Sequence, residues 1–335
     1  MRGQRQLMTF LFLAAALLPG SALAAGGGDD PVMDMIYQTG NFLLLLGVIF
    51  VLARKPVVAF FAGRRDQIKG DLEQAAALLD KSTQPLIIVG GGAQHASAEV
   101  TQLAETLQAP VSAFRTGHGV LDSRHYLSVT SPLGNELWKD CDVVLAIGTR
   151  LQMQQMAWGT DDQLKIIHID IDEAALGRHT DPAIGILADA RLASEALLEA
   201  LSANNRSRSN RQTEMAQRKA QMAERLAHLE PPLSFLRAIR NALPEDGIFV
   251  EDLTQVGYVS RFAFPVYQPR TFLTSGYQGT LGWGYASALG AKVACPDRAV
   301  VSIAGDGGFM FNAQELASAV RHNIAVVVVV FSDGA

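Results

Sequence analysis

Two aspartates stand where parallel strands are expected to end, and carboxylates in such positions can bind a metal ion. Asp306 follows the apolar run 299–304, and Asp333 follows the apolar run 325–331. In a doubly wound sheet, ligands bind beyond the carboxyl ends of the strands. Two carboxylates there repel each other unless a cation lies between them. Mg²⁺ suits this need, because it takes one or two carboxylates and lets phosphate oxygens and water complete its octahedron.

Glycines flank the first of these aspartates. Gly305, Gly307 and Gly308 leave the turn bare of side chains, so a diphosphate can meet backbone N–H groups where the next helix starts. Taken alone, Asp-Gly after a strand is usually an ordinary turn. The metal interpretation therefore depends on the second aspartate, which follows after a helix and a strand.

The elements that position these residues follow from the pattern of apolar side chains. From residue 85 onward, short β-rich runs alternate with amphipathic helical stretches. This predicts an α/β chain with two doubly wound parallel-sheet domains. A central Rossmann-like domain is expected over 84–203, and a diphosphate-binding domain over 233–335. The expected strands are 86–89, 111–114, 142–147, 166–171, 248–250, a buried strand 299–304 and an adjacent buried strand 325–331. The expected helices carry the stripe Val100, Leu103, Ala104 and Leu107, the run 190–201, the run 233–243, and Leu316, Ala319 and Val320.

A glycine run at 90–92 follows the first expected strand and suggests a dinucleotide site. However, His95 stands where the third glycine of G-x-G-x-x-G is expected, and the second strand ends at Arg115 without an acid that could bind a ribose. We therefore expect a Rossmann-like domain without a nicotinamide site. An adenine nucleotide bound elsewhere on this domain stays an alternative, and FAD is compatible with it but not indicated.

Residues 204–232 are expected to link the two units. Arg206, Arg208 and Arg211 could face RNA or an anionic lipid, but no aromatic residues interleave with these charges. We interpret the segment as a solvated interdomain face.

Composition excludes several classes of function. The 335 residues carry 28 Lys and Arg against 33 Asp and Glu, a formal net charge of −5, which disfavours a nucleic-acid partner. The two cysteines, Cys141 and Cys295, exclude a disulfide scaffold and a cysteine zinc site, and they suit a reducing compartment. The chain has no G-x-S-x-G, P-loop or H-E-x-x-H motif, so serine hydrolase, P-loop and zinc-protease functions lack a site.

The N-terminus predicts membrane targeting. Residues 1–25 have the positive start, apolar core and small-residue cleavage site of a secretory signal, and Pro19-Gly20 breaks the apolar core, which argues against a first membrane helix. Residues 35–53 lack charge and, as a helix of roughly 28 Å, are long enough to span a bilayer. Arg54 and Lys55 follow this segment, so the positive-inside rule places the rest of the chain in the cytoplasm. A buried core helix is the alternative.

Residues 30–80 resemble the b subunit of rotary ATP synthases. The similarity is carried by NFLLLL (41–46), RKPV (54–57) and RRDQIK (64–69), which look like its membrane anchor and first stalk turns. In that family the anchor continues into a long dimerising helix, whose start resembles residues 70–77 of this chain. The pattern ends at about Lys81. This resemblance implies an anchor at the inner (cytoplasmic) membrane, or a cytoplasmic protein if residues 1–80 are a fusion artefact.

Residues 84–335 resemble thiamine diphosphate-dependent enzymes of the acetolactate synthase type. The Gly-Asp-Gly turn followed by a helix, a strand and a second Asn/Asp matches their cofactor motif. GYQGTLGWG (276–284) matches their second glycine-rich segment. Further matches are IHIDID (167–172) and EDLTQVG (251–257). The family implies two α/β domains, Mg²⁺, a 2-oxo acid substrate, and active sites formed between subunits, hence at least a homodimer.

The resemblance also implies roles for individual residues around the cofactor. The Mg²⁺ ligands would be Asp306, Asp333 and the carbonyl of Ala335. The diphosphate would contact Gly305, Gly307 and Gly308, with Gln255 nearby. The thiazolium and aminopyrimidine rings would be held by the wedge Leu281, the carbonyl of Gly279 and the intervening Thr280. In this family the wedge lies under the thiazolium ring and forces the cofactor into a bent shape. The bend brings the amino group of the pyrimidine against the thiazolium carbon that attacks the substrate.

The chain also departs from the family pattern. Ser332-Asp333 replaces the more frequent Asn-Asn, and Gly308 replaces a common serine or alanine. The pyrimidine-binding domain has no counterpart, and with it the glutamate that activates the cofactor, so no catalytic residue is nominated. The sequence stops at Ala335. We therefore expect an incomplete diphosphate domain and little turnover from this chain alone.

Three functions follow as hypotheses. The first is a carbon–carbon lyase or carboligase that acts on 2-oxo acids. The second is a membrane-anchored stalk or assembly protein, for which the evidence lies in residues 30–80. The third is a membrane-tethered cofactor sensor that binds without catalysis.

Overall fold

The computed structural model describes residues 31–202, 207–332 and 334, and the chain divides into two compact units, 1–64 and 65–335. The expected signal segment, 1–25, lies outside the described residues, as do the expected metal ligands Asp333 and Ala335.

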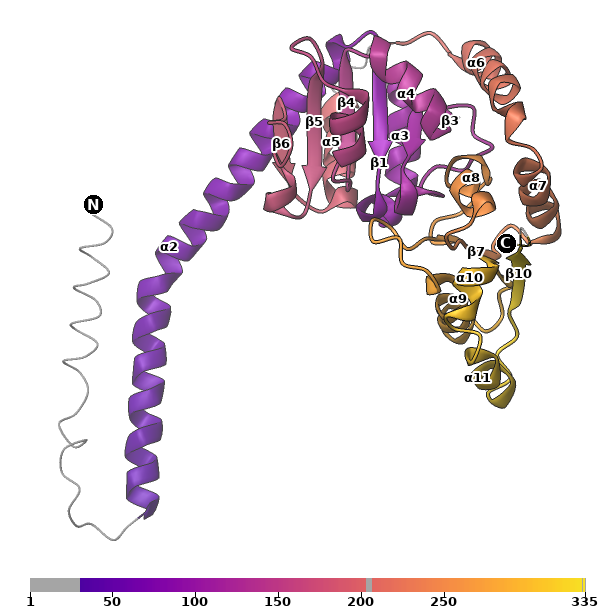
Figure 1. Ribbon diagram of the computed structural model, residues 1–335. Coiled ribbons are helices and arrows are strands. Elements are labelled where there is room, and N and C mark those ends of the chain that lie inside the picture. Colours follow the sequence, from indigo (N-terminus) through magenta and orange to yellow (C-terminus); the bar gives the residue numbers. More distant parts are fainter. Residues whose placement is uncertain (1–30, 203–206, 333, 335) are drawn as a thin grey trace. The chain divides into compact units, whose positions relative to one another are not determined.

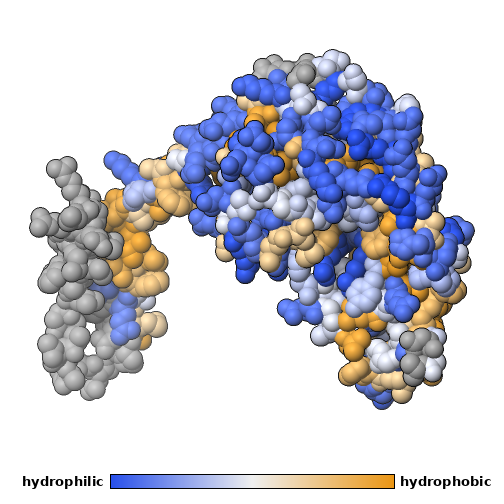
Figure 2. Space-filling view, turned by 45° about the horizontal axis from the view of Figure 1, so that its top comes forward, coloured by the Kyte–Doolittle hydropathy of each residue, from blue (hydrophilic) through white to orange (hydrophobic). Residues whose placement is uncertain are grey.

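The described part of the first unit is one long helix. Helix α2 (Pro31–Lys81) includes the expected apolar span 35–53, and it continues through Pro56 into the second unit (Figure 1). From Gln38 it is long and apolar enough to cross a membrane, with a window of mean hydropathy 2.2 that is 0% buried. Phe42 and Val51 are among its exposed apolar side chains, and Figure 2 shows apolar residues gathered along this helix. A buried core helix, the alternative for 35–53, is thus not observed.

A six-stranded parallel sheet forms the central part of the second unit. Its strand order is β3-β2-β1-β4-β5-β6, the Rossmann order that reverses between β1 and β4. The strands are β1 (Pro85–Val89), β2 (Val111–Ala113), β3 (Ser128–Val129), β4 (Val143–Ile147), β5 (Lys165–Asp170) and β6 (Ile184–Leu187). The longer helices are α3 (Ser97–Leu107), α4 (Ser131–Asp140) and α5 (Ala190–Ser202). The predicted stripe on α3 is buried at all four positions. The Rossmann-like prediction is therefore confirmed.

The central, six-stranded part of the second unit begins earlier in the sequence than residue 84, where the central domain was predicted to start. Leu72, Ala75, Ala76 and Leu79 on the last turns of α2 belong to the same buried core as the six-stranded sheet. The following loop is held by Asp142, whose carboxylate accepts hydrogen bonds from the hydroxyls of Ser82 and Thr83 and from the backbone N–H groups of Thr83 and Gln84. The stretch expected to start a stalk is therefore packed against this sheet, because its alanines and leucines repeat with a helical period.

The segment predicted as a linker is largely helical. Helix α6 (Gln212–Leu226) is followed by a 3₁₀ turn at Ala227–Leu229. Met215 and Met222 on α6 are buried in the core of the central unit. Arg211 pairs with Glu214 at 2.6 Å, and Arg208 donates hydrogen bonds to the carbonyls of Leu79 and Ser82. These two arginines therefore act within the fold and do not form a solvated face, while Arg206 lies outside the described residues.

A four-stranded parallel sheet follows, with the order β10-β9-β7-β8. Its strands are β7 (Ile248–Val250), β8 (Phe272–Leu273), β9 (Val300–Gly305) and β10 (Val327–Phe331). The helices are α7 (Pro232–Ala242), α8 (Gln255–Ala263), α9 (Trp283–Ala294), α10 (Asp306–Met310) and α11 (Glu315–Arg321). Strands β9 and β10 are in register from Val301 opposite Val327 to Gly305 opposite Phe331. Both of their carboxyl ends thus reach the same edge of the sheet.

The expectation that residues 325–331 form a buried strand is wrong for the described structure. Val327 is 59% exposed and Val330 is 40% exposed. The reason is position, since β10 is an edge strand that pairs only with β9. On α11, Leu316 and Val320 are also exposed, so the apolar residues expected to bury this helix do not do so among the described residues.

Side chains of the central part reach the four-stranded part within this unit. The ring of His118 lies against Phe272 in a tilted arrangement, with ring centroids 4.8 Å apart, and its Nε2 lies 2.7 Å from the carbonyl oxygen of Arg261. Ser123 bonds the backbone of Val266 in both directions, at 2.9 Å. These contacts tie the loop after β2 to helix α8 and the chain beyond it.

Acid is expected to weaken this contact. Burial lowers the pKa of His118 from 6.5 to about 4, so between these values the unfolded chain binds a proton that the folded chain does not. Stability is therefore full above pH 6.5 and falls as the pH drops toward 4, by about 1–2 kcal/mol at pH 5. Urea unfolding at pH 7 and pH 5 measures this loss. His118→Gln should be less sensitive to acid, and an equal pH dependence in both proteins would contradict the assignment.

Candidate functional site

A cavity of about 490 Å³ lies at the carboxyl ends of β9 and β10. It brings together six of the eight residues predicted to contact the cofactor, namely Gln255, Leu281, Gly305, Asp306, Gly307 and Gly308. Its remaining wall is mostly apolar and includes Phe235, Phe311 and Phe331. The cavity therefore has an oxygen-bearing, glycine-lined end and an apolar end.

Asp306 lies where strand β9 passes into helix α10. Its carboxylate accepts a hydrogen bond of 2.6 Å from the Ser332 hydroxyl and one of 2.7 Å from the Gly307 N–H. The bond from Ser332, and then that from Gly307, holds the pKa of this carboxyl below its ordinary value of 3.8. The group is thus an anion at neutral pH, and an exposed carboxylate oxygen is a ligand that Mg²⁺ prefers.

The described residues at this edge do not form a complete metal site. Nowhere in 31–202, 207–332 and 334 do three or more His, Cys, Asp or Glu side chains gather closely enough to hold an ion. Asp306 and the Ser332 hydroxyl supply oxygens directly after the ends of the adjacent strands β9 and β10. The second predicted carboxylate, Asp333, follows Ser332 directly in the sequence.

The two glycine-rich segments meet beside Asp306. Gly282 has φ +78°, and a Cβ there would lie 2.7 Å from the Cβ of Phe311, so only glycine fits this close approach. The side-chain amide of Asn312 donates a hydrogen bond to the Gly282 carbonyl. A Cβ added to Gly308 would lie 3.8 Å from Leu281, which shows how closely the glycine turn and Leu281 adjoin.

Leu281 is placed as an apolar wall of the cavity. Its side chain is 50% exposed and lines the cavity next to the glycine turn, so it does not pack in the core. Burial in the core was the alternative for this residue, and the structure excludes it. A bound ring could cover this exposed apolar surface.

Gly279 and Thr280 are not brought to the cavity. They lie in the loop before α9, where the carbonyl of Gly276 accepts a hydrogen bond from Arg115. Tyr277 in this loop lies under the guanidinium of Arg115, 4.7 Å from the ring centroid. The loop is therefore held by the central part of the unit, and the roles proposed for Gly279 and Thr280 stay predictions.

Two buried acids join elements around the cavity but do not line it. Asp252 accepts hydrogen bonds from the backbone N–H groups of Leu253, at 2.7 Å, and Gly284, at 3.0 Å, and so joins the end of β7 to the start of α9. Glu251 is fully buried and pairs with Arg261 on α8 at 3.0 Å. Sequence reasoning placed both in a matching motif but assigned them no role. Two adjacent acids directly after a short apolar strand were the available signal.

A second cavity, of about 420 Å³, lies at the carboxyl ends of the six-stranded sheet. It is lined by the glycine run 90–92 and by Arg115, Arg150, Asp170 and Asp172. Strand β2 lacks an acid, as predicted, but β5 supplies Asp170 at its end. The rule that ligands bind at strand ends, applied to β5, would have identified these carboxylates. FAD at this cavity stays a prediction.

Comparison with known proteins agrees with these two α/β parts. Residues 72–201 match the family "Thiamine pyrophosphate enzyme, central domain", and residues 252–335 match "Thiamine pyrophosphate enzyme, C-terminal TPP binding domain". The first match begins at Leu72, the residue at which the buried face of α2 also begins.

Curated relatives extend the similarity over most of the chain. It is 30% identical over 301 residues to acetolactate synthase isozyme 1 large subunit of Escherichia coli (strain K12), covering 86% of this chain and 53% of the relative. It is 32% identical over 347 residues to acetolactate synthase of Arthrospira platensis, covering 93% and 57%. It is 33% identical over 291 residues to 2-hydroxyacyl-CoA lyase of Arabidopsis thaliana, covering 81% and 50%. The chain thus spans about half the length of these relatives. With its cavity at the ends of β9 and β10, it belongs to the thiamine pyrophosphate-dependent enzymes.

Proposed function

We propose that the cavity at β9 and β10 holds thiamine diphosphate with Mg²⁺, and that the chain serves carbon–carbon bond cleavage or formation on 2-oxo acids, as in acetolactate synthase. The observation that carries this proposal is the position of Asp306. It lies between a glycine-lined end of the cavity and a hydroxyl on the neighbouring strand, with Leu281 on the adjoining wall.

The residues present fit the cofactor. Asp306 would hold the metal, together with Asp333 and the carbonyl of Ala335. The backbone at Gly305, Gly307 and Gly308 would approach the diphosphate, because no side chain stands in its way. When bound, the cofactor supplies a nucleophilic carbon and a sink for the electrons released from the substrate.

The rest of the cavity would orient the rings and exclude water. Leu281 would support the thiazolium ring, and the carbonyl of Gly279 would orient the aminopyrimidine with Thr280 beside it. Gln255 would lie near the diphosphate. The aromatic side chains of Phe235, Phe311 and Phe331 form an apolar wall that would keep water from the reacting carbon.

Carbon dioxide release tests the reaction. The purified whole chain is incubated with [1-¹³C]pyruvate, thiamine diphosphate and Mg²⁺, and labelled carbon dioxide and bicarbonate are followed by NMR. We expect release that requires the cofactor and is lost in Asp306→Ala, however slow it is. Release that does not differ between the two proteins would contradict the proposal.

Leu281→Ala is expected to weaken binding of thiamine diphosphate by about 10- to 30-fold, because the truncation removes apolar surface worth about 2 kcal/mol. Isothermal titration calorimetry in Mg²⁺ measures the change. Val293→Ala, at an apolar side chain of α9 that is also exposed and lies away from the cavity, is the matched control and should bind as the wild type does. Equal affinities in all three proteins would show that Leu281 does not touch the cofactor.

We also propose that residues 35–53 anchor the chain in the inner (cytoplasmic) membrane, with the enzyme part in the cytoplasm. The support is an apolar helix whose side chains have no protein partner to cover them among the described residues, followed by Arg54 and Lys55. A stalk or assembly role beside rotary ATP synthase is the second candidate function and rests on the same helix. Alkaline carbonate extraction tests the anchor. If residues 35–53 span the membrane, the chain should stay with the membrane pellet. Co-purification with ATP synthase subunits would favour the stalk role.

We propose, finally, that the enzyme part is at least a homodimer. Apolar side chains are exposed on the consecutive elements α10, α11 and β10, among them Met310, Leu316, Val320 and Val327, and a second copy would cover such side chains. Light scattering of the purified chain should give a mass of at least two chains, and a monomer at micromolar concentration would contradict this.

A further inference from the structure

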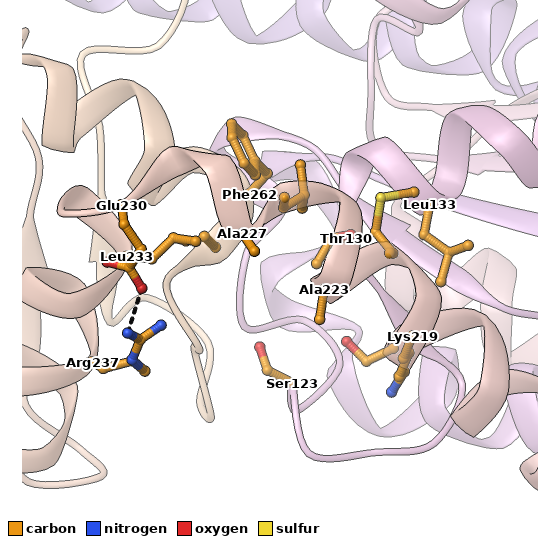
Figure 3. A pocket seen from close by; sticks show the side chains of 14 residues that line it. Ser123, Thr130, Leu133, Lys219, Ala223, Ala227, Glu230, Leu233, Arg237 and Phe262 are labelled. Carbon is orange, nitrogen blue, oxygen red and sulfur yellow. Dashed lines mark hydrogen bonds and ion pairs between the residues drawn. The ribbon is translucent and has the colours of Figure 1, made fainter.

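A third cavity, of about 400 Å³, is lined mainly by helices and touches the six-stranded sheet only at its edge strand β3. Helices α6, α7 and α8 contribute to its wall, together with the segment from Ser123 to Leu133 of the central part. Figure 3 shows Lys219 and Leu133 toward one end, and the ion pair of Glu230 and Arg237 toward the other. Its volume is in the range of small-molecule sites.

The cavity carries one positive charge that the protein does not neutralise within the described residues. Arg237 is paired with Glu230 at 2.5 Å, so these two lining charges cancel. Lys219 lines the cavity on α6, and its ammonium donates a hydrogen bond to the carbonyl of His125 at 2.9 Å. In the part of the chain that the structure describes, no carboxylate lies within ion-pair distance of Lys219. Burial lowers the pKa of this amine, which an anion beside it would reverse.

A second polar group in the wall also lacks a partner. The hydroxyl oxygen of Thr130 is buried, and no hydrogen-bond partner for it exists among the described residues. Buried hydroxyls are nearly always hydrogen-bonded in folded proteins, so this one indicates a missing partner. Ser128 lines the same wall, on strand β3.

The remainder of the wall is apolar. It is formed by side chains from four different elements, among them Leu133, Met222, Leu226, Leu233 and Phe262. A ligand that fits this cavity needs an apolar body, a single negative charge for the amine of Lys219, and an oxygen that can pair with a hydroxyl.

We propose that this cavity binds a small carboxylate with an apolar tail, whose carboxylate pairs with Lys219 and accepts a hydrogen bond from Thr130. The site is separate from the cofactor cavity but shares two helices with it. The start of α8 lines the cofactor cavity with Gln255, and its end lines this one with Phe262. On α7, Phe235 lines the first cavity and Leu233 the second. A ligand bound at Lys219 therefore contacts two helices that also shape the cofactor cavity.

Hydrogen exchange with hexanoate as the probe tests the proposal on the purified whole chain. Amide exchange in α6 and α7 is measured by mass spectrometry across a hexanoate titration, without cofactor. We expect saturable protection of these helices. Lys219→Met should weaken the apparent affinity by about tenfold or more, since a charged hydrogen bond is lost. Lys139→Met, at an exposed lysine on α4, is the matched control and should respond as the wild type does.

Two further arms keep the outcome unambiguous. Hexan-1-ol and hexylamine carry the same tail without the negative charge and should protect at least about tenfold more weakly. Ala223→Phe fills the cavity while keeping Lys219, so it should abolish protection even if the lysine variant is poorly folded. The proposal is wrong if hexanoate gives no protection or if hexan-1-ol protects equally well. It is also wrong if Lys219→Met and Ala223→Phe both respond to hexanoate as the wild type does.

Discussion

Replacing Asp306 with alanine is expected to weaken Mg²⁺-dependent binding of thiamine diphosphate by about 100-fold or more, because it removes the carboxylate that we propose as a direct metal ligand. The carboxylate lies at the end of β9, charged at neutral pH and held by Ser332 and Gly307. The alternatives for it were an ordinary turn residue or a metal ligand. Only a metal ligand makes cofactor binding depend on Asp306 and Mg²⁺ together.

The measurement is isothermal titration calorimetry of the purified chain with the cofactor in Mg²⁺. Asp297→Ala, at an exposed aspartate that follows α9, is the matched control and should bind as the wild type does. Asp306→Asn removes the charge with almost no change of shape, so it separates loss of the metal from a disturbed turn. If all three variants bind the cofactor as the wild type does, Asp306 is not a metal ligand.

Glu251→Ala is expected to lower the free energy of unfolding by about 3–5 kcal/mol, which is typical when one partner of a buried ion pair is removed. Glu251 is fully buried, while Arg261 is 18% exposed, and the two groups make hydrogen bonds of 3.0 to 3.2 Å. Thr274 donates to the same carboxylate. The truncation leaves a largely buried guanidinium without its anion, so helix α8 loses its ion pair with the residue that follows β7.

Urea unfolding of the purified whole chain measures this change. Glu136→Ala is the matched control, because Glu136 pairs with Arg225 on an exposed surface, with side chains 32% and 54% exposed. Exposed pairs contribute little, so the control should unfold close to the wild type. If Glu251→Ala and Glu136→Ala lower the free energy of unfolding by equal amounts, the buried pair of Glu251 contributes no more to stability than a surface pair.

The longer strands and the parallel topology could be predicted because they depend on local patterns. Strands β1 and β4 are continuous apolar runs bounded by turns, which is typical of a sheet covered on both faces. Strands β3 and β8 have two residues each, too few for a pattern to be detected. The start of the central unit was misplaced because α2 continues without a break from an apolar span into the helix that packs against the sheet.

The features of the site that lie within one short chain segment could be predicted from the sequence. The turn at Asp306 and the predicted wedge Leu281 lie in short motifs, and the structure places them around one cavity. The bond from Ser332 depends on the register of β9 and β10, and the pairing of Glu251 with Arg261 depends on the packing of α8. Neither can be read from spacing alone. The cavity beside Lys219 is built from distant segments and has no motif.

The most direct test of the central claim is a titration of the wild-type chain with thiamine diphosphate, once in Mg²⁺ and once in EDTA. The account predicts saturable binding in Mg²⁺ that becomes about 100-fold weaker or more in EDTA, at least as large a loss as that from Asp306→Ala. Binding of equal strength in both buffers, or no binding in either, would contradict the assignment of the β9–β10 cavity as a magnesium and diphosphate site.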